Sequence, residues 1–235
     1  EKKEVSASHS ELTQSTRLDN LAYAHPTSQG VFAAGLTYLS QSTLEGRDAL
    51  GHTTGNFNAS DAAGVVSIGR KGDFADAGVN LKLIQSHIGS AQASGAAVDL
   101  GLKRAFGGLS LGAALRNVGP GLKFQEQRND LPLQLAFGAA WRFRAGHSAA
   151  AELLNGPRGG GTDVGFGGEY QAIKGIFLRA GYTTQSAATG GSGFDAARGM
   201  TLGLGWRNGR YRFDYAALPT GELGTSHRFT FGMSW

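Results

Sequence analysis

The sequence predicts an all-β fold, a transmembrane antiparallel β-barrel of about 14 strands with short periplasmic turns and long extracellular loops. Three observations predict it. Apolar and polar residues alternate with a period of two in segment after segment, short and long connections alternate between these segments, and charges keep to one face of each segment. A closed barrel with lipid outside and polar groups inside explains all three. We expect one barrel domain over residues 1–235.

Composition excludes several other classes. The chain has 38 Gly, 5 Pro and no Cys, so it has neither disulfides nor Cys-based metal or redox sites. No run of about 18 apolar residues exists to form a transmembrane helix. The net charge of +4 is spread singly along the strands, which argues against nucleic-acid binding. Glu1–Glu4 precede no apolar stretch, so we expect a mature or truncated chain without its signal peptide.

The clearest strand is the last one. From Ser226 to Trp235 every second residue from His227 onward is aromatic, Met or His, and the residues between them are polar or small. The same pattern recurs along the chain in segments of about 9–11 residues or slightly more, the length that crosses a bilayer at a tilt. The predicted strands are 3–11, 17–25, 30–40, 57–70, 76–88, 93–105, 109–117, 133–143, 147–154, 163–171, 175–184, 199–207, 209–217 and 226–235.

The faces of these strands differ in chemistry. In 133–143, for example, Leu133, Phe137 and Trp141 share one face, and Gly138 and Arg142 share the other. A charge that faced lipid at the middle of the bilayer would cost about 2–4 kcal/mol, so the charged face is assigned to the lumen. The predicted lumen-facing charges, either structural or lining a path, are Lys82, Asp99, Lys103, Arg116, Arg142, Glu152, Glu169, Arg179, Arg207, Arg212, Asp214 and Arg228.

The connections give a second, independent indication. Every second connection is short, such as 26–29, 71–75 and the Asn208-Gly209 step, a dipeptide that favours tight hairpins. The others are mostly long, as at 41–56, 117–132 and 184–198. Outer-membrane barrels have short turns in the periplasm and long loops outside the cell. An even number of strands then puts both termini in the periplasm.

Aromatic residues near strand ends predict interfacial girdles, although aromatic side chains are also common in strands generally. The predicted girdle residues are Tyr23, Tyr38, Trp141, Tyr170, Tyr182, Trp206, Tyr215 and Trp235.

Several segments resemble a known family when read in order. They are Val5–Glu11, Leu21–Pro26, Leu44–Asp48, Phe57–Asp61, Val79–Lys82, Leu115–Pro120, Leu131–Leu133 and Arg179–Tyr182. Together they resemble the PorV/PorQ-like outer-membrane barrels, which are similar to the fourteen-stranded long-chain fatty-acid transporters. The chain departs from that pattern because it starts at the first strand, without the usual Asn-Pro-Ala-Gly-like segment. We therefore expect the N-terminal hatch to be absent.

The resemblance implies an accessory barrel that binds a protein partner in a type IX secretion-like or surface assembly. Two alternatives stay open, a transporter of hydrophobic molecules such as fatty acids and a passive pore. Phe177, Leu154 and Ile84 fall on inward faces and could line an apolar path or merely fill space. Besides protein, the expected partners are outer-membrane lipid and lipopolysaccharide, and no nucleic acid or cofactor is expected.

Enzymatic and metal-dependent functions are disfavoured. Ser226 and His227 are adjacent, but consecutive strand residues face opposite sides and cannot form a nucleophile–base pair. Glu45, Asp48 and His52 could gather a Ca²⁺ ion, yet a solvated polar loop is the simpler interpretation, so no metal site is predicted. The Gly-rich stretches at 156–161 and 190–193 lack the helix and Lys of a phosphate-binding loop.

Overall fold

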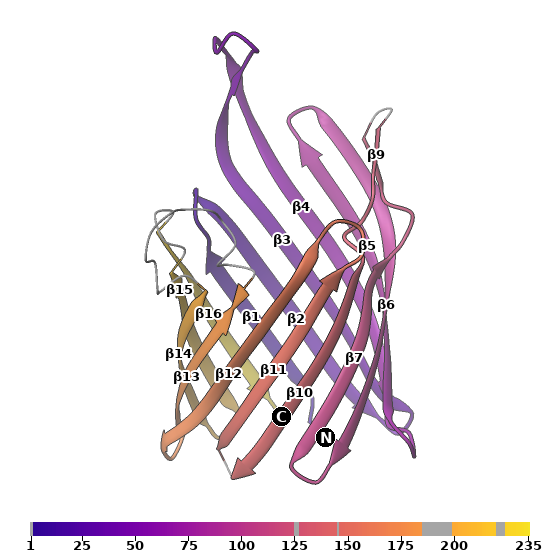
Figure 1. Ribbon diagram of the computed structural model, residues 1–235, viewed down its shortest axis with the longest axis vertical. Helices are drawn as coiled ribbons and strands as arrows, with labels where there is room; N and C mark the ends of the chain where they lie inside the picture. The colour runs from indigo at the N-terminus through magenta and orange to yellow at the C-terminus, as the bar shows by residue number, and fades with distance from the viewer. Residues whose placement is uncertain (1, 125–126, 145, 185–198, 220–223) are drawn as a thin grey trace.

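Fourteen antiparallel strands close into one barrel in the computed structural model of the chain, in the order β1-β16-β15-β14-β13-β12-β11-β10-β7-β6-β5-β4-β3-β2 (Figure 1). This confirms the predicted fold class. The structure describes residues 2–124, 127–144, 146–184, 199–219 and 224–235. In the described part of the chain, no helix is long and apolar enough to cross a membrane.

Each strand pairs with its neighbours in sequence, and β1 pairs with β16 to close the ring. The bounds of the barrel strands are β1 (Glu4–Glu11), β2 (Thr16–Thr27), β3 (Gly30–Arg47), β4 (Thr53–Arg70), β5 (Asp76–Ile88), β6 (Ala91–Phe106), β7 (Leu109–Val118), β10 (Gln134–Arg144), β11 (His147–Gly156), β12 (Gly161–Ile173), β13 (Ile176–Thr183), β14 (Met200–Asn208), β15 (Tyr211–Pro219) and β16 (Thr225–Ser234).

The two ends of the barrel differ, as the spacing of the strands predicts. At one end, which we name the turn end, short connections such as 28–29, 107–108 and 209–210 join successive strands. The hairpin turn between β14 and β15 lies at residues 209–210, one residue beyond Asn208. Gly209 has φ +58° there, which glycine adopts without strain. The opposite end, the loop end, carries the connections 12–15, 48–52 and 119–133. Most of the predicted loop 184–198, including the Gly-rich stretch 190–193, lies outside the described residues. Both termini lie toward the turn end (Figure 1).

One predicted loop is wrong. Residues 41–56 are mostly strand, because β3 and β4 continue past the rest of the wall as a two-stranded arm over residues 44–57 (Figure 1). Leu44 pairs with Phe57 at the base of this arm. Its other residues are mainly Gly, Thr, Asn and charged residues, so the arm lacks the apolar alternation by which strands are recognised in sequence.

The predicted loop 117–132 also contains structure. A small hairpin, β8 (Leu122–Phe124) paired with β9 (Gln127–Asn129), packs against β6 beside the barrel mouth. Leu131 is one of the few buried apolar residues of the described chain. At the start of this loop Asn117 has φ +61° and forms a bulge opposite Asp99, which bends the chain out of β7.

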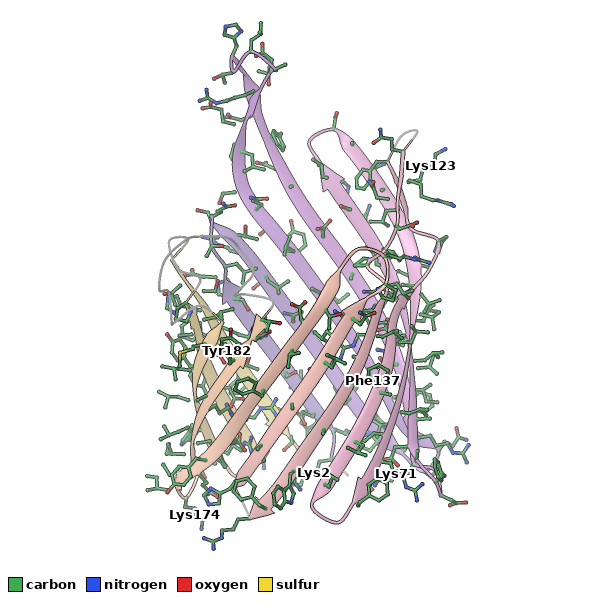
Figure 2. The ribbon with its side chains drawn as sticks, in the orientation of Figure 1. Lys2, Lys71, Lys123, Phe137, Lys174 and Tyr182 are labelled. Carbon is green, nitrogen blue, oxygen red and sulfur yellow. The ribbon has the colours of Figure 1, made fainter. Side chains whose placement is uncertain are left out.

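Apolar side chains lie on the outside of the barrel rather than in a core. Within the described residues, the buried apolar side chains are only Ala93, Ala97, Leu131, Ala136 and Phe177. In contrast, Leu36 is 63% exposed and Leu83 is 65% exposed, and similar residues project from every side of the wall (Figure 2). A surface this apolar is unfavourable in water and favourable in a bilayer.

Candidate functional site: the lumen wall

Small side chains line most of the inner face of the barrel. Strand alternation places on it, among others, Ser6, Ser8, Ala22, Ala33, Gly35, Ala63, Ser67, Gly78, Gly101, Gly112, Ala114, Gly138, Ala140, Ala150, Gly165, Gly167, Gly181, Gly203, Gly205, Ala216, Thr230 and Gly232. Eight-stranded barrels are filled by their inward side chains, whereas barrels of 16–18 strands enclose an aqueous channel. Fourteen strands with side chains this small leave the interior unfilled.

Two cavities within the barrel show this hollow interior. One of about 870 Å³ is lined by Lys103, Glu152, Arg179, Asp214 and Arg228 together with many small residues. The other, of about 520 Å³, lies against β5, β6, β7 and β10. The two cavities share Lys103 and Glu152 in their walls, so they are parts of one lumen. Charged groups therefore face an open space that water can enter.

The most ordered polar group is centred on Arg179. Its Nε donates to Glu169 Oε2 and its Nη1 donates to Asp214 Oδ1, both at 2.7 Å. Asp214 belongs to β15, so the guanidinium reaches across β14, where Gly203 and Gly205 have no side chain to block it. A Cβ at Gly205 would lie 2.7 Å from Arg179 Nη2 and 2.9 Å from Asp214 Oδ1. The two glycines are what permit this ion pair.

Further charges extend this cluster toward the turn end. Arg207 lies 3.5 Å from Glu169 and stacks over the ring of Phe177, with 4.3 Å from Cζ to the ring centroid. Arg212 lies 3.1 Å from Asp214 and also pairs with Glu4 at 3.3 Å. The Nε of Arg212 is buried and makes no hydrogen bond within the described residues, and its contact with Asp214 is an ion pair.

A second polar group lies on β5, β6 and β7. Lys82 Nζ is 2.6 Å from Asp99 Oδ1, and Asn80 donates to the other carboxylate oxygen at 3.1 Å. The backbone N–H of Asn117, in the bulge of β7, donates to Asp99 at 2.8 Å. Both charges of the pair are largely buried, at 16% and 13% side-chain exposure. Since every neighbour of Asp99 is a donor, this group anchors the wall below β8 and β9.

The remaining predicted lumen charges are more weakly held. Arg116 donates to Gln134 at 3.2 Å and lies 3.8 Å from Glu152. Arg228 donates to Ser10 at 2.9 Å. Lys103 and Arg142 face inward by strand alternation and have no ion-pair partner among the described carboxylates. The charges predicted from sequence thus form two groups, the looser Arg116–Glu152 pair and a few separate cations rather than one site.

Sequence inspection missed several polar residues of the inner face. Asp61 accepts a hydrogen bond from Ser86, and Thr37 donates to Asn20 at 2.8 Å. Asp76 lies opposite Lys103 in the register of β5 and β6. These residues could have been identified from the sequence, because each occupies one of the alternate strand positions that face the lumen.

All eight predicted girdle residues lie on the outer face by alternation, at different heights. Five of them lie near the turn end: Tyr23, Trp141, Tyr170, Trp206 and Trp235. Tyr23 stacks there on Trp235, with ring centroids 6.4 Å apart. Tyr38 and Tyr182 lie closer to the loop end. Tyr215 is near the middle of β15, where its hydroxyl is 2.9 Å from His227 Nδ1.

The three inward apolar residues are not brought together. Phe177, Leu154 and Ile84 lie on β13, β11 and β5, and no two of them are register partners. Phe177 is only 6% exposed, beneath Arg207. These residues do not form a continuous apolar path through the lumen.

Neither the Ser–His pair nor the acidic loop is arranged for catalysis or metal binding. Ser226 faces inward and is buried, whereas His227 faces outward against Tyr215. In the arm, the N–H groups of His52 and Leu50 donate to Asp48, each at 2.9 Å, and they lower the pKa of its carboxyl. Over the described ranges, no three His, Asp or Glu side chains gather as a metal site.

Comparison with known proteins supports the fold and gives no family. No protein-family model matches the chain, and no curated protein matches it in sequence. Among solved structures it is similar to the Pseudomonas putida toluene transporter TodX, with a TM-score of 0.63 and 12% identity over 99% of this chain and 86% of TodX. A TodX deltaS2S3 mutant, a monoaromatic hydrocarbon channel, gives 0.64 and 14% over 99% and 88%. A weaker match, with a TM-score of 0.47 and 10% identity, is the KdgM porin. The comparisons give no support to a relationship with PorV or PorQ.

Proposed function

We propose that the protein is a channel of the bacterial outer membrane through which small hydrophilic solutes diffuse passively. The observation that carries this proposal is the opposed chemistry of the two faces of one wall. Exposed Leu, Val, Phe and Trp cover the outside, while Gly, Ala, Ser and charged side chains line a hollow inside. Such a wall excludes lipid from the lumen and admits water.

The same distribution supports a position and an orientation. In the outer face of β3 and β4 the composition changes from Leu36 and Tyr38 to Ser40 and Ser60 toward the arm, as at a membrane boundary. By the general plan of such barrels, the turn end and both termini would lie in the periplasm. The arm would then project outside the cell, and the outer wall would contact phospholipid and lipopolysaccharide.

A second candidate is a channel for hydrophobic molecules. It is supported by the fold shared with TodX, a toluene transporter, and by the inward position of Leu154 in the larger cavity. The polar lumen and the separation of Phe177, Leu154 and Ile84 favour the hydrophilic pore instead. The accessory role in secretion, which the sequence resemblance implies, has no support from the fold comparisons.

Single-channel recording in planar bilayers tests the proposal. Purified barrel should give stable conductance steps, and the variant Gly101→Trp should reduce them severalfold. Gly101 faces the lumen between Gly78 and Ala114, and a Cβ there would have no atom within 4 Å, so the indole fits but narrows the passage. The matched control is Leu102→Trp, which places the same ring on the outer face.

Two results would argue against a hydrophilic pore. The first is the absence of conductance from correctly folded protein, and the second is an equal conductance in both variants. If conductance is absent while cells with intact lipopolysaccharide take up toluene faster when they carry the protein, the hydrophobic channel is the better assignment.

A further inference from the structure

A groove crosses the outer wall from β10 to β15. It has a volume of about 1100 Å³, and most of its exposed lining surface is apolar, although the inward-facing Glu169 and Arg179 also border it. Its floor is a row of small residues that are register partners on adjacent strands: Ala149 pairs with Gly168, and Gly168 pairs with Ala180. On β14 the larger and exposed Leu202 interrupts this row, and Ala217 resumes it on β15. Small residues in line on successive strands lower the surface, and this produces the groove.

Larger side chains form its two banks. On the turn side the register partners Tyr170 and Leu178 line the groove beside the floor. On the loop side the next outward register partners are Phe166 and Tyr182, with ring centroids 5.5 Å apart, and they lie beyond the residues that line the groove. The floor lies two residues from the start of β11 at Ala149 and six residues from the start of β15 at Ala217. The groove therefore starts close to the turn end on β11 and extends on β15 toward the middle of the apolar outer surface.

The low end of the groove carries a cation. A register shift between Arg142 and Arg144 places two residues of β10 opposite one of β11, so that Arg144 pairs with His147 instead of following strand alternation inward. A bulge of this kind redirects a side chain to the other face of a sheet. Arg144 and His147 both line the groove, and no described carboxylate forms an ion pair with Arg144. His147 stacks on Phe143, with ring centroids 6.3 Å apart.

We propose that this groove is a binding site for an anionic phospholipid of the leaflet at the turn end. An acyl chain would lie along Ala149, Gly168 and Ala180, and the phosphate would be held by the Arg144 guanidinium, whose planar fork matches phosphate geometry. A phospholipid has the same arrangement as this groove, an apolar channel in the bilayer with a charged group at one end, here a cation that pairs with no carboxylate of the described residues. The inference depends on the proposed membrane position of the barrel and not on conduction through its lumen.

Tryptophan quenching by brominated lipid tests the proposal. Trp141 pairs with Ala149 and so borders the floor of the groove. In a protein that carries Trp206→Phe and Trp235→Phe, Trp141 is the only reporter. In vesicles of unlabelled phosphatidylcholine, brominated phosphatidylglycerol should associate about fivefold more strongly than brominated phosphatidylcholine, as expected for one basic residue near an anionic lipid.

Two groups of variants separate the headgroup from the chain. Arg144→Gln should abolish the preference for brominated phosphatidylglycerol over brominated phosphatidylcholine, and Arg144→Lys should keep part of that preference. Gly168→Leu should lower quenching by both lipids, because a Cβ there meets only Ser148 O at 3.5 Å and the rest of the side chain fills the groove. Ala180→Leu serves if Gly168→Leu does not fold.

The control is Arg104→Gln. Arg104 is another outward arginine near the turn end, and it stacks on Phe74 at 4.0 Å and on Phe106 at 4.9 Å, outside the groove. The preference for brominated phosphatidylglycerol should survive this substitution.

Equal quenching by the two lipids in the parent protein, or an unchanged preference in Arg144→Gln, would overturn the proposal. So would a Gly168→Leu variant that quenches normally but changes from dimer to monomer, which would make the groove a protein interface. Loss of conductance alone would leave the lipid site standing.

Discussion

At the scale of single residues, the polar lumen depends on positions where a side chain is missing. Arg179 can bind Glu169 on one side and Asp214 on the other because β14 presents glycine between them. The two carboxylates are about one-fifth exposed, so water solvates them only in part. Arg179 pairs with both carboxylates, and Arg207 and Arg212 add further positive charge beside them.

A methyl group at Gly205 should therefore destabilise the barrel. In Gly205→Ala the new Cβ would lie within 3 Å of both Arg179 and Asp214, and displacing this pair should cost about 1–3 kcal/mol. Urea unfolding in detergent micelles, followed by tryptophan fluorescence, measures the loss.

The matched control for this change is Gly101→Ala. Gly101 also lies on the inner face of a strand, and a Cβ there would meet no atom within 4 Å. Its free energy of unfolding should stay within about 0.5 kcal/mol of the parent, the range of an unstrained surface change. Equal losses in the two variants would show that strand flexibility, and not the Arg179 cluster, sets the cost.

At the scale of elements, the strands that touch lipid were predictable and the others were not. Hydrocarbon on one side and water on the other impose a period of two, so β10, β14 and β16 could be located from sequence alone. The arm of β3 and β4 has water on both sides, and nothing then selects alternation. Its strand character comes from cross-strand hydrogen bonds, for which the sequence carries little signal.

The same reasoning separates the predictable part of the lumen from the rest. Strand parity was enough to assign Arg142 and Asp99 to the inner face. The partners of each charge depend on register and on bulges, which parity does not give. Arg144 illustrates the limit, because one extra residue in β10 moves it to the outer face beside His147.

The arm should be dispensable for folding and for the pore. Beyond Leu44 and Phe57 its two strands pair only with each other, since β2 ends its pairing at Gln41 and β5 ends its pairing at Ala59. Replacing residues 44–57 with an Asn-Gly turn should leave the unfolding transition and the unit conductance within about 20% of the parent. Differential scanning calorimetry and bilayer recording measure the two quantities. A barrel that no longer assembles would assign the arm a role in strand closure.

At the scale of the whole molecule, the barrel has its apolar side chains outside and its polar side chains inside, the reverse of a water-soluble globular protein, and its two ends differ. Apolar groups cover its outside, polar groups line its inside, and every strand of the ring is hydrogen-bonded on both sides, so no strand edge is left open in the bilayer. Lys2, Lys71 and Lys174 all lie at the turn end, whereas Lys123 lies toward the opposite end (Figure 2). A basic turn end suits a leaflet that contains anionic phospholipid.

This asymmetry predicts a fixed orientation that can be measured. The chain has no cysteine, so a single introduced thiol is the only site for a maleimide. Leu50 lies at the tip of the arm and is 81% exposed, and Arg210 lies in the turn between β14 and β15. In intact Gram-negative cells, Leu50→Cys should react fully with a maleimide on a polyethylene glycol chain too large for the lumen. Arg210→Cys should react only after the outer membrane is permeabilised, because its turn faces the periplasm. The reverse pattern would place the long loops and the arm in the periplasm and would require the phospholipid groove to be assigned to the outer leaflet.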